Sequence, residues 1–168
     1  GGGGGPRQEN RADAVLQYLD AGAVSLRYLY VMDLDSICYR DPFALARGWP
    51  DATQLNLAYE TGEESRREFE SRFAKCGVAE EVGVLREGPL PSTALIGGRA
   101  SAVHGVFRQY AETLRRVRAA KVNPAASCDM VSFILAVAPW IARAADRRTA
   151  LLQPLFALPG AGELEGGG

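Results

Sequence analysis

The sequence predicts an α/β domain in which a mostly parallel sheet is flanked by helices. Residues 26–32 form a short, nearly continuous apolar run rich in aromatic and β-branched side chains, which is typical of a strand buried on both faces. Other short strand patterns alternate along the chain with amphipathic helical patterns, as in α/β proteins. The 168 residues, 47% hydrophobic and 23% charged, suit one globular domain.

We expect that domain over residues 10–153, with flexible tails at 1–9 and 154–168, because glycine runs occupy both ends of the chain. The formal net charge is −1, so there is no bulk positive field to attract nucleic acid, and we expect no nucleic-acid partner. No apolar run is long enough to span a bilayer, and no transmembrane segment is expected.

The first elements follow from periodicity. Residues 10–21 predict a helix whose apolar positions recur at helical spacing, with Gly22 as its stop. These apolar positions are Ala12, Val15, Leu16 and Leu19. The apolar strand 26–32 comes next and leads directly into an acidic segment.

The middle of the chain predicts four further elements. Residues 41–47 indicate a short helix opened by an Asp-Pro pair, and residues 48–51 a turn. Residues 54–59 alternate polar and apolar side chains, which predicts a half-exposed strand. Residues 63–76 predict a charged helix closed by Gly77.

The last third is mainly helical. Residues 92–96 predict a short strand that two glycines end. A long helix over residues 100–121 follows. Its apolar stripe consists of Val103, Val106, Phe107, Tyr110, Leu114 and Val117. Another helix begins near Asp129, is ended or kinked at Pro139, and continues as a helical stretch to about residue 152.

The number and spacing of the cysteines restrict the possible disulfides and metal sites. Cys38, Cys76 and Cys128 are odd in number and share no close spacing. The absence of a CxxC pair argues against a zinc ribbon. Two alternatives remain open, one disulfide with a thiol left over or three buried free thiols.

Two carboxylates follow the buried strand. Asp33 and Asp35 stand at i and i+2 where the strand stops, so both side chains can turn toward one cation. Mg²⁺ and Mn²⁺ prefer carboxylate oxygens and usually share them with phosphates. The pair therefore favours a metal–diphosphate site, and the alternative is a solvated strand end with two surface acids.

Further candidates for chemistry are the pair Gly97 and Gly98, together with Asp129 and His104. Gly97 and Gly98 permit either a close backbone approach to a ligand or simply a tight turn. Asp129 opens a helix, where a carboxylate is also stabilised by the helix dipole. His104, the one histidine, lies off the apolar stripe of its helix and is interpreted as a surface or packing residue.

Together these segments resemble the nucleotide-sugar-dependent glycosyltransferases of the A-type fold. Residues 30–43 resemble their DxD region, in which a hydrophobic strand enters DxD and a basic-Asp-Pro-Phe turn follows. Residues 92–103 resemble their later strand and the helix after it, and residues 128–133 resemble the Asp-Met step that opens the next helix. The order and spacing of the three segments agree.

The resemblance implies a transferase that moves a sugar from a nucleotide-diphosphate donor to a glycan, protein or small-molecule acceptor. It implies that Asp35 binds Mn²⁺ or Mg²⁺ on the donor's diphosphate and that Asp33 contacts the metal or the ribose. It implies that the backbone at Gly97 and Gly98 passes near donor sugar or acceptor. Asp129 would hydrogen-bond the sugar or the acceptor, or act as the base. The family also suggests the secretory pathway, in particular the Golgi.

The chain departs from the family pattern in three ways. Ser92 and Thr93 stand where the family often has Asn, and no histidine follows His104 to serve as a late metal ligand. Fewer residues precede the DxD than the family's first nucleotide-binding strands require. We therefore expect an incomplete nucleotide-diphospho-sugar transferase-like domain, a fragment of a larger enzyme.

Two other functions fit parts of the pattern. A phosphatase of the haloacid dehalogenase type also has an apolar strand ending in DxD, with Asp33 as nucleophile and Asp35 as acid/base. Ser92 or Thr93 could serve as its second motif and Lys121 as its lysine, but its late pair of acids is missing. The third hypothesis is a non-catalytic fragment or interaction domain whose acids lie on the surface.

Overall fold

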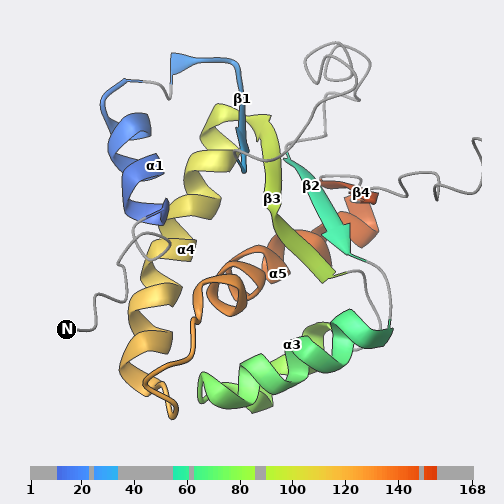
Figure 1. Cartoon of the computed structure of the whole chain (residues 1–168). Coiled ribbons are helices and arrows are strands. Elements are labelled where there is room, and N and C mark those ends of the chain that lie inside the picture. Colours follow the sequence, from blue (N-terminus) through green and yellow to red (C-terminus); the bar gives the residue numbers. More distant parts are fainter. Residues whose placement is uncertain are drawn as a thin grey trace, which may run out of the picture.

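The computed structural model describes residues 11–22, 25–33, 55–60, 63–85, 90–147 and 150–154. In chain order the elements are α1 (Arg11–Asp20), β1 (Tyr28–Met32), β2 (Leu55–Glu60), α3 (Glu63–Lys75), the 3₁₀ segment η2 (Ala79–Leu85), β3 (Leu90–Arg99), α4 (Ala100–Ala120), α5 (Asp129–Arg147) and β4 (Ala150–Pro154) (Figure 1). The predicted helix 41–47, the turn 48–51 and the tail 1–9 lie outside the described residues. So does the tail predicted at 154–168, except for Pro154, which belongs to β4.

The described strands form one sheet in the order β1-β3-β2-β4. Strand β3 runs antiparallel to both of its neighbours, with Met32 of β1 opposite Leu95 and Leu57 of β2 opposite Ile96. Only the pair β2 and β4 is parallel, with Leu55 opposite Ala150. The prediction of a mostly parallel sheet is therefore wrong, because three of the four strands form an antiparallel set.

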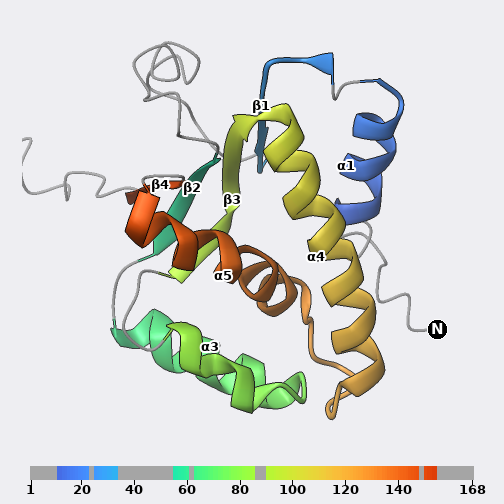
Figure 2. The same ribbon diagram turned by 180° about the vertical axis from the view of Figure 1, so that it is seen from behind.

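The path of the chain around α3 explains this error. The parallel prediction rests on strands that alternate with helices, because an α-helix between two strands commonly forms a crossover that returns the chain to run in the same direction. Instead α3 lies beyond the end of the sheet and packs against α5 and η2, so the chain comes back through β3 in the reverse direction (Figure 2). The apolar content of residues 26–32 predicted a strand buried on both faces, and this is also wrong. The residues of β1 are half-buried and Met32 is exposed.

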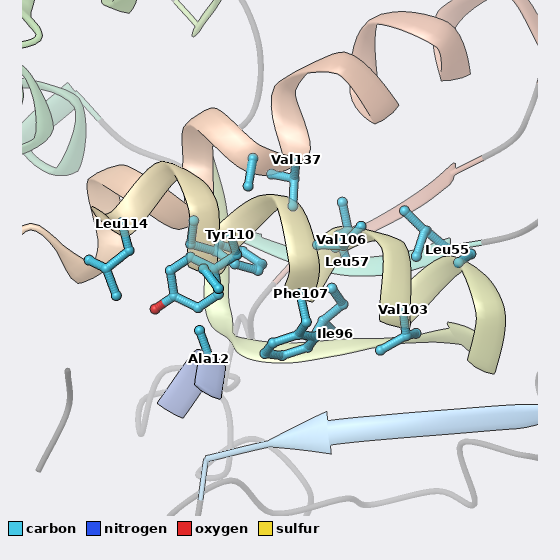
Figure 3. Close-up of a cluster of buried hydrophobic side chains, with 14 residues drawn as sticks. Ala12, Leu55, Leu57, Ile96, Val103, Val106, Phe107, Tyr110, Leu114 and Val137 are labelled. Carbon is cyan, nitrogen blue, oxygen red and sulfur yellow. The ribbon is translucent and has the colours of Figure 1, made fainter. Parts of the chain in front are cut away.

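Helices α1, α4 and α5 contribute to a main apolar core packed on one face of the sheet (Figure 3). The strands supply Leu55, Leu57 and Ile96 to it. The helices supply Ala12, Ala102, Val103, Val106, Phe107, Tyr110, Ala111, Leu114, Phe133, Ala136 and Val137. A second core joins α3 to the C-terminal end of α4 and the N-terminal end of α5. It contains Phe69, Phe73, Cys76, Val78, Leu90, Val117, Cys128, Val131 and Ile134.

The helix predictions from residues 10–21, 63–76 and 100–121 are confirmed by α1, α3 and α4. All six residues of the apolar stripe predicted for α4 are buried. Gly77 follows α3 with a φ of 73°, a left-handed conformation that suits glycine at a helix end.

Other predictions need correction. Strand β2 exists, but it is not half-exposed, because its residues from Leu55 to Ala58 are buried. Strand β3 is longer than the predicted 92–96 and includes the two glycines. Helix α5 passes through Pro139 and ends at Arg147, and β4 stands where the helical stretch was expected to continue.

A disulfide joins Cys76 to Cys128 across 52 residues of sequence. Of the two alternatives for the cysteines, the structure has a disulfide, and Cys38 lies outside the described residues. Both bridged cysteines are buried in the second core. The bridge fastens the end of α3 to the residue that directly precedes α5.

Candidate functional site

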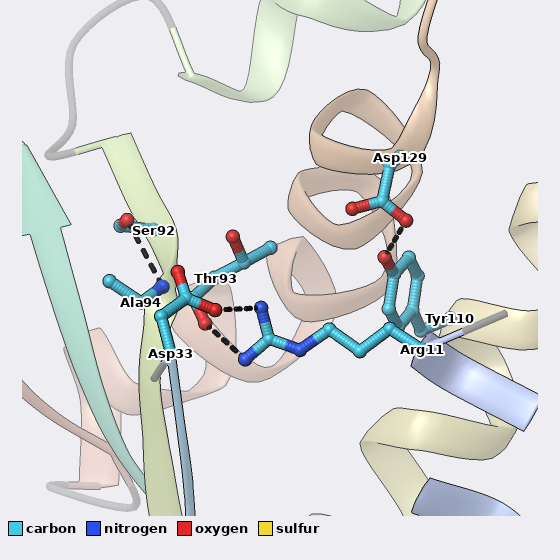
Figure 4. A network of polar contacts seen from close by, with 7 residues as sticks. All are labelled: Arg11, Asp33, Ser92, Thr93, Ala94, Tyr110 and Asp129. Carbon is cyan, nitrogen blue, oxygen red and sulfur yellow. Dashed lines mark hydrogen bonds and ion pairs between the residues drawn. The ribbon is translucent and has the colours of Figure 1, made fainter. Parts of the chain in front are cut away.

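Asp33 directly follows β1 and remains attached to the sheet. Its backbone N–H donates to the carbonyl of Ala94 on β3 at 3.1 Å. Its side chain, 39% exposed, accepts at Oδ1 from Nη1 of Arg11, the first residue of α1, at 2.5 Å. Nη2 of the same guanidinium donates to the carbonyl oxygen of Thr93 at 2.8 Å (Figure 4). Arg11 therefore ties α1 to β1 and β3 at once.

Asp129 reaches the same region from the opposite side. It is the first residue of α5, and its Oδ1 accepts a hydrogen bond from the hydroxyl of Tyr110 on α4 (Figure 4). The Tyr110 side chain is almost completely buried. Its ring packs against Phe107 and Phe133, with centroid distances of 6.0 and 5.5 Å. The hydroxyl is consequently held in place by the main core.

The charges of this region act on one another. Burial raises the pKa of Asp129 above the ordinary carboxyl value, and the negative charge of Asp33 raises it further. The hydrogen bond from Tyr110 and the positive charge of Arg11 offset part of this rise in pKa. Asp33 and Asp129, which lie far apart in sequence, therefore share one electrostatic environment.

Tyr110 acts as a permanent donor in this environment. Burial raises its pKa, and the neighbouring charge of Asp129 adds to the rise, since a phenolate beside a carboxylate is unfavourable. The hydroxyl therefore stays protonated and always offers its hydrogen to Asp129. The five residues Arg11, Asp33, Thr93, Tyr110 and Asp129 are called the carboxylate cluster below.

The glycine pair lies away from the carboxylate cluster. Gly97 is opposite Tyr30 in the register of β1 and β3, three residues along β3 from Ala94 or about 10 Å. A Cβ at Gly97 would overlap the Tyr30 ring. Gly98 has a φ of 137°, which few other residues adopt. In the described residues the close approach at Gly97 is thus to an aromatic ring of the neighbouring strand.

Of the site residues predicted from sequence, the structure brings Asp33 and Asp129 into one cluster. Asp35 lies outside the described residues. Arg11 and the role of Tyr110 were not predicted from the sequence. Tyr110 could have been found, because a buried tyrosine hydroxyl in an apolar stripe needs a hydrogen-bond partner. No local pattern marks Arg11.

The carboxylate cluster contains oxygens of the type that hard divalent cations bind. The Asp33 carboxylate and the Thr93 carbonyl are gathered by a single positive group, the Arg11 guanidinium. Mg²⁺ is commonly held by one or two carboxylates, with water and substrate phosphates completing its shell. Within the described ranges no three His, Cys, Asp or Glu residues group as metal ligands.

Comparisons with protein-family models, with curated proteins and with solved structures gave no match. In the part of the chain that the structure describes, none of the helices has the length and apolar character needed to cross a membrane. The described residues form a domain with a mainly antiparallel sheet and helices on one face, with Asp33 at the end of β1 and Asp129 at the start of α5.

Proposed function

We propose that this chain belongs to a metal-dependent glycosyltransferase that uses a nucleotide-diphosphate sugar. The observation that carries the proposal is the gathering of Asp33 and Asp129 in one cluster. The resemblance gives these residues roles on the same donor and acceptor, and those roles require the two carboxylates to be close. The ordered sequence segments and this proximity are independent supports.

In this proposal Asp33 and Asp35 hold Mn²⁺ or Mg²⁺. When bound, the cation neutralises the charge that develops on the departing nucleoside diphosphate. Asp129 accepts a hydrogen bond from a hydroxyl of the donor sugar or the acceptor, or takes its proton. Burial raises the pKa of Asp129, which makes its carboxylate a stronger base than an ordinary one. Tyr110 fixes one carboxylate oxygen and leaves the other for the substrate.

The disulfide supports the compartment that the resemblance suggests. Structural disulfides form and persist in oxidising compartments and are rare where glutathione keeps thiols reduced. Cys76 and Cys128 are both buried, as expected of a bridge made during folding. We therefore place the protein in the secretory pathway as part of the proposal.

Calorimetric titration of UDP, with and without Mn²⁺, tests the function. The wild-type chain is compared with Asp35→Asn and with Asp13→Asn, which removes an exposed carboxylate of α1 away from β1. We expect UDP binding to require Mn²⁺, to be lost in Asp35→Asn and to persist in Asp13→Asn. Metal-independent binding, or equal affinities in the wild-type chain and Asp35→Asn, would contradict the proposed metal site.

A second assay separates the remaining alternatives. If the folded chain does not bind UDP, Mg²⁺-dependent release of phosphate from p-nitrophenyl phosphate would favour the phosphatase hypothesis. If neither activity nor binding is found, the non-catalytic hypothesis stands.

A further inference from the structure

We infer that the disulfide between Cys76 and Cys128 positions Asp129, because it ties the first turn of α5 to the end of α3 and keeps the Asp129 carboxylate at the hydroxyl of Tyr110. The two cysteines are positioning residues in this inference, since they act on the candidate site through Asp129. This role rests on the proposed function only in taking Asp129 as a site residue.

Cys128 is built into the first turn of α5. It directly precedes Asp129, the first residue of that helix. Its carbonyl oxygen accepts the backbone N–H of Ser132 at 3.0 Å and the Ser132 hydroxyl at 2.7 Å. The Ser132 side chain is completely buried. A displacement of Cys128 would therefore move Asp129 as well.

The other end of the bridge is anchored in the second core. Cys76 directly follows α3 and is completely buried. Its backbone N–H donates to the carbonyl of Arg72 at 3.0 Å, which continues the hydrogen bonding of the helix. Phe73 and Val78, on either side of Cys76 in the sequence, are buried in the same core. Helix α3 therefore gives the bridge a fixed end.

The exposed segment before α5 is fastened to the same end of α3. Residues 122–125 are all exposed. The backbone N–H of Asn123 donates to the carbonyl of Lys75, the last residue of α3, at 3.1 Å. The bridge and this hydrogen bond thus both attach the entry to α5 to the end of α3.

Asp129 needs such a restraint because the burial of a carboxylate is unfavourable. Burial removes water from the carboxylate and raises the pKa of Asp129. A first turn that was free to move could lower its energy by exposing the carboxylate to water. Tyr110 is fixed in the main core and cannot follow such a movement. The bridge therefore opposes the separation of Asp129 from the Tyr110 hydroxyl.

The acid–base titration of Asp129 tests this role, followed through the NMR resonance of its carboxyl carbon and assigned with Asp129→Asn. All proteins carry Cys38→Ala, so that this thiol cannot exchange with the bridge. They are the reference, the bridge-free variant Cys76→Ala/Cys128→Ala, and Leu57→Ala. Leu57→Ala is the matched control, because it weakens the fold by removing a buried side chain of β2 and leaves the bridge in place. Far-UV circular dichroism confirms that each variant is folded.

We expect the pKa of Asp129 to fall toward its ordinary value of 3.8 in the bridge-free variant, because the released carboxylate regains contact with water. In Leu57→Ala the pKa should stay raised, as in the reference. An unchanged pKa of Asp129 in the folded bridge-free variant would overturn the inference and leave the bridge with a role in overall stability alone.

A second measurement decides the question if the bridge-free variant does not fold. Tyr110→Phe removes the hydrogen bond to Asp129 and keeps the bridge. Hydrogen exchange of the Ser132 backbone N–H reports on the first turn of α5, because this group donates to Cys128. We expect the same exchange rate in Tyr110→Phe as in the wild-type chain. A faster rate would show that the Tyr110 hydroxyl holds the turn, and it would overturn the inference.

The proposed function fails separately from this role. It is refuted if the folded wild-type chain does not bind UDP in the presence of Mn²⁺, whereas the titration of Asp129 and the exchange of Ser132 involve no ligand.

Discussion

The bridge between Cys76 and Cys128 should contribute a large share of the stability of this domain. Replacing both cysteines with alanine, Cys76→Ala/Cys128→Ala, removes the disulfide cross-link between the end of α3 and the start of α5. The unfolded chain then gains the conformational freedom that the bridge had denied it.

The magnitude follows from the sequence separation of 52 residues. In the chain-entropy description, closing a loop of that length lowers the entropy of the unfolded chain enough to add about 4 kcal/mol to the free energy of unfolding. Small domains are stable by only about 5–15 kcal/mol in total. Loss of the bridge should therefore lower the urea midpoint strongly, and it should also loosen the start of α5 where Asp129 lies.

Urea unfolding followed by circular dichroism measures this effect. Both proteins should carry Cys38→Ala, so that the third cysteine cannot exchange with the bridge, and Cys38→Ala alone serves as the reference. Alkylation of the denatured wild-type chain without reductant should modify a single thiol. A difference below about 1 kcal/mol, or alkylation of all three cysteines, would refute the reasoning.

Three further outcomes are expected in urea unfolding. Gly97→Ala should lose about 1–3 kcal/mol because the new Cβ meets the Tyr30 ring, and adding Tyr30→Ala should reduce this penalty. Phe107→Ala should lose about 3–5 kcal/mol from the main core. Burial raises the pKa of Asp129, so its ionisation lowers stability as the pH rises from 3.8 through that raised value. Asp129→Asn, which still accepts from Tyr110, should therefore be more stable than the wild-type chain at pH 7 and equal to it below pH 3.8; a lower stability at pH 7 would contradict this.

Local periodicity was a good guide to the helices. The stripe through α4, from Val103 to Val117, was visible because an amphipathic helix repeats its apolar positions every three or four residues. The direction of the strands was not visible, because alternation and apolar content are the same in either direction. The reversal of β3 depends on α3 packing beside α5, a contact between distant segments.

The candidate site likewise contains residues that the sequence predicted and residues that it did not. Asp33 was predicted because it stands where an apolar strand stops, and Asp129 because residues 128–133 resemble the Asp-Met step of the glycosyltransferase family. Their partners Arg11 and Tyr110 were not, since a partner far away in sequence leaves no local pattern. Gly97 shows another case, because its sequence context left open a ligand or a tight turn, while the structure places the Tyr30 ring against it.

The order of the strands in the sheet affects how this protein can fold while it is being synthesised on the ribosome. Two of the three pairs of neighbouring strands in the described sheet skip a strand in the sequence, with β1 paired to β3 and β2 to β4. The sheet cannot be completed until Ala150–Pro154 has been synthesised. Loop closure over such distances slows folding and leaves strand edges open in the meantime. We expect the nascent chain to depend on early formation of local helices, above all the long helix α4, until its last strand emerges.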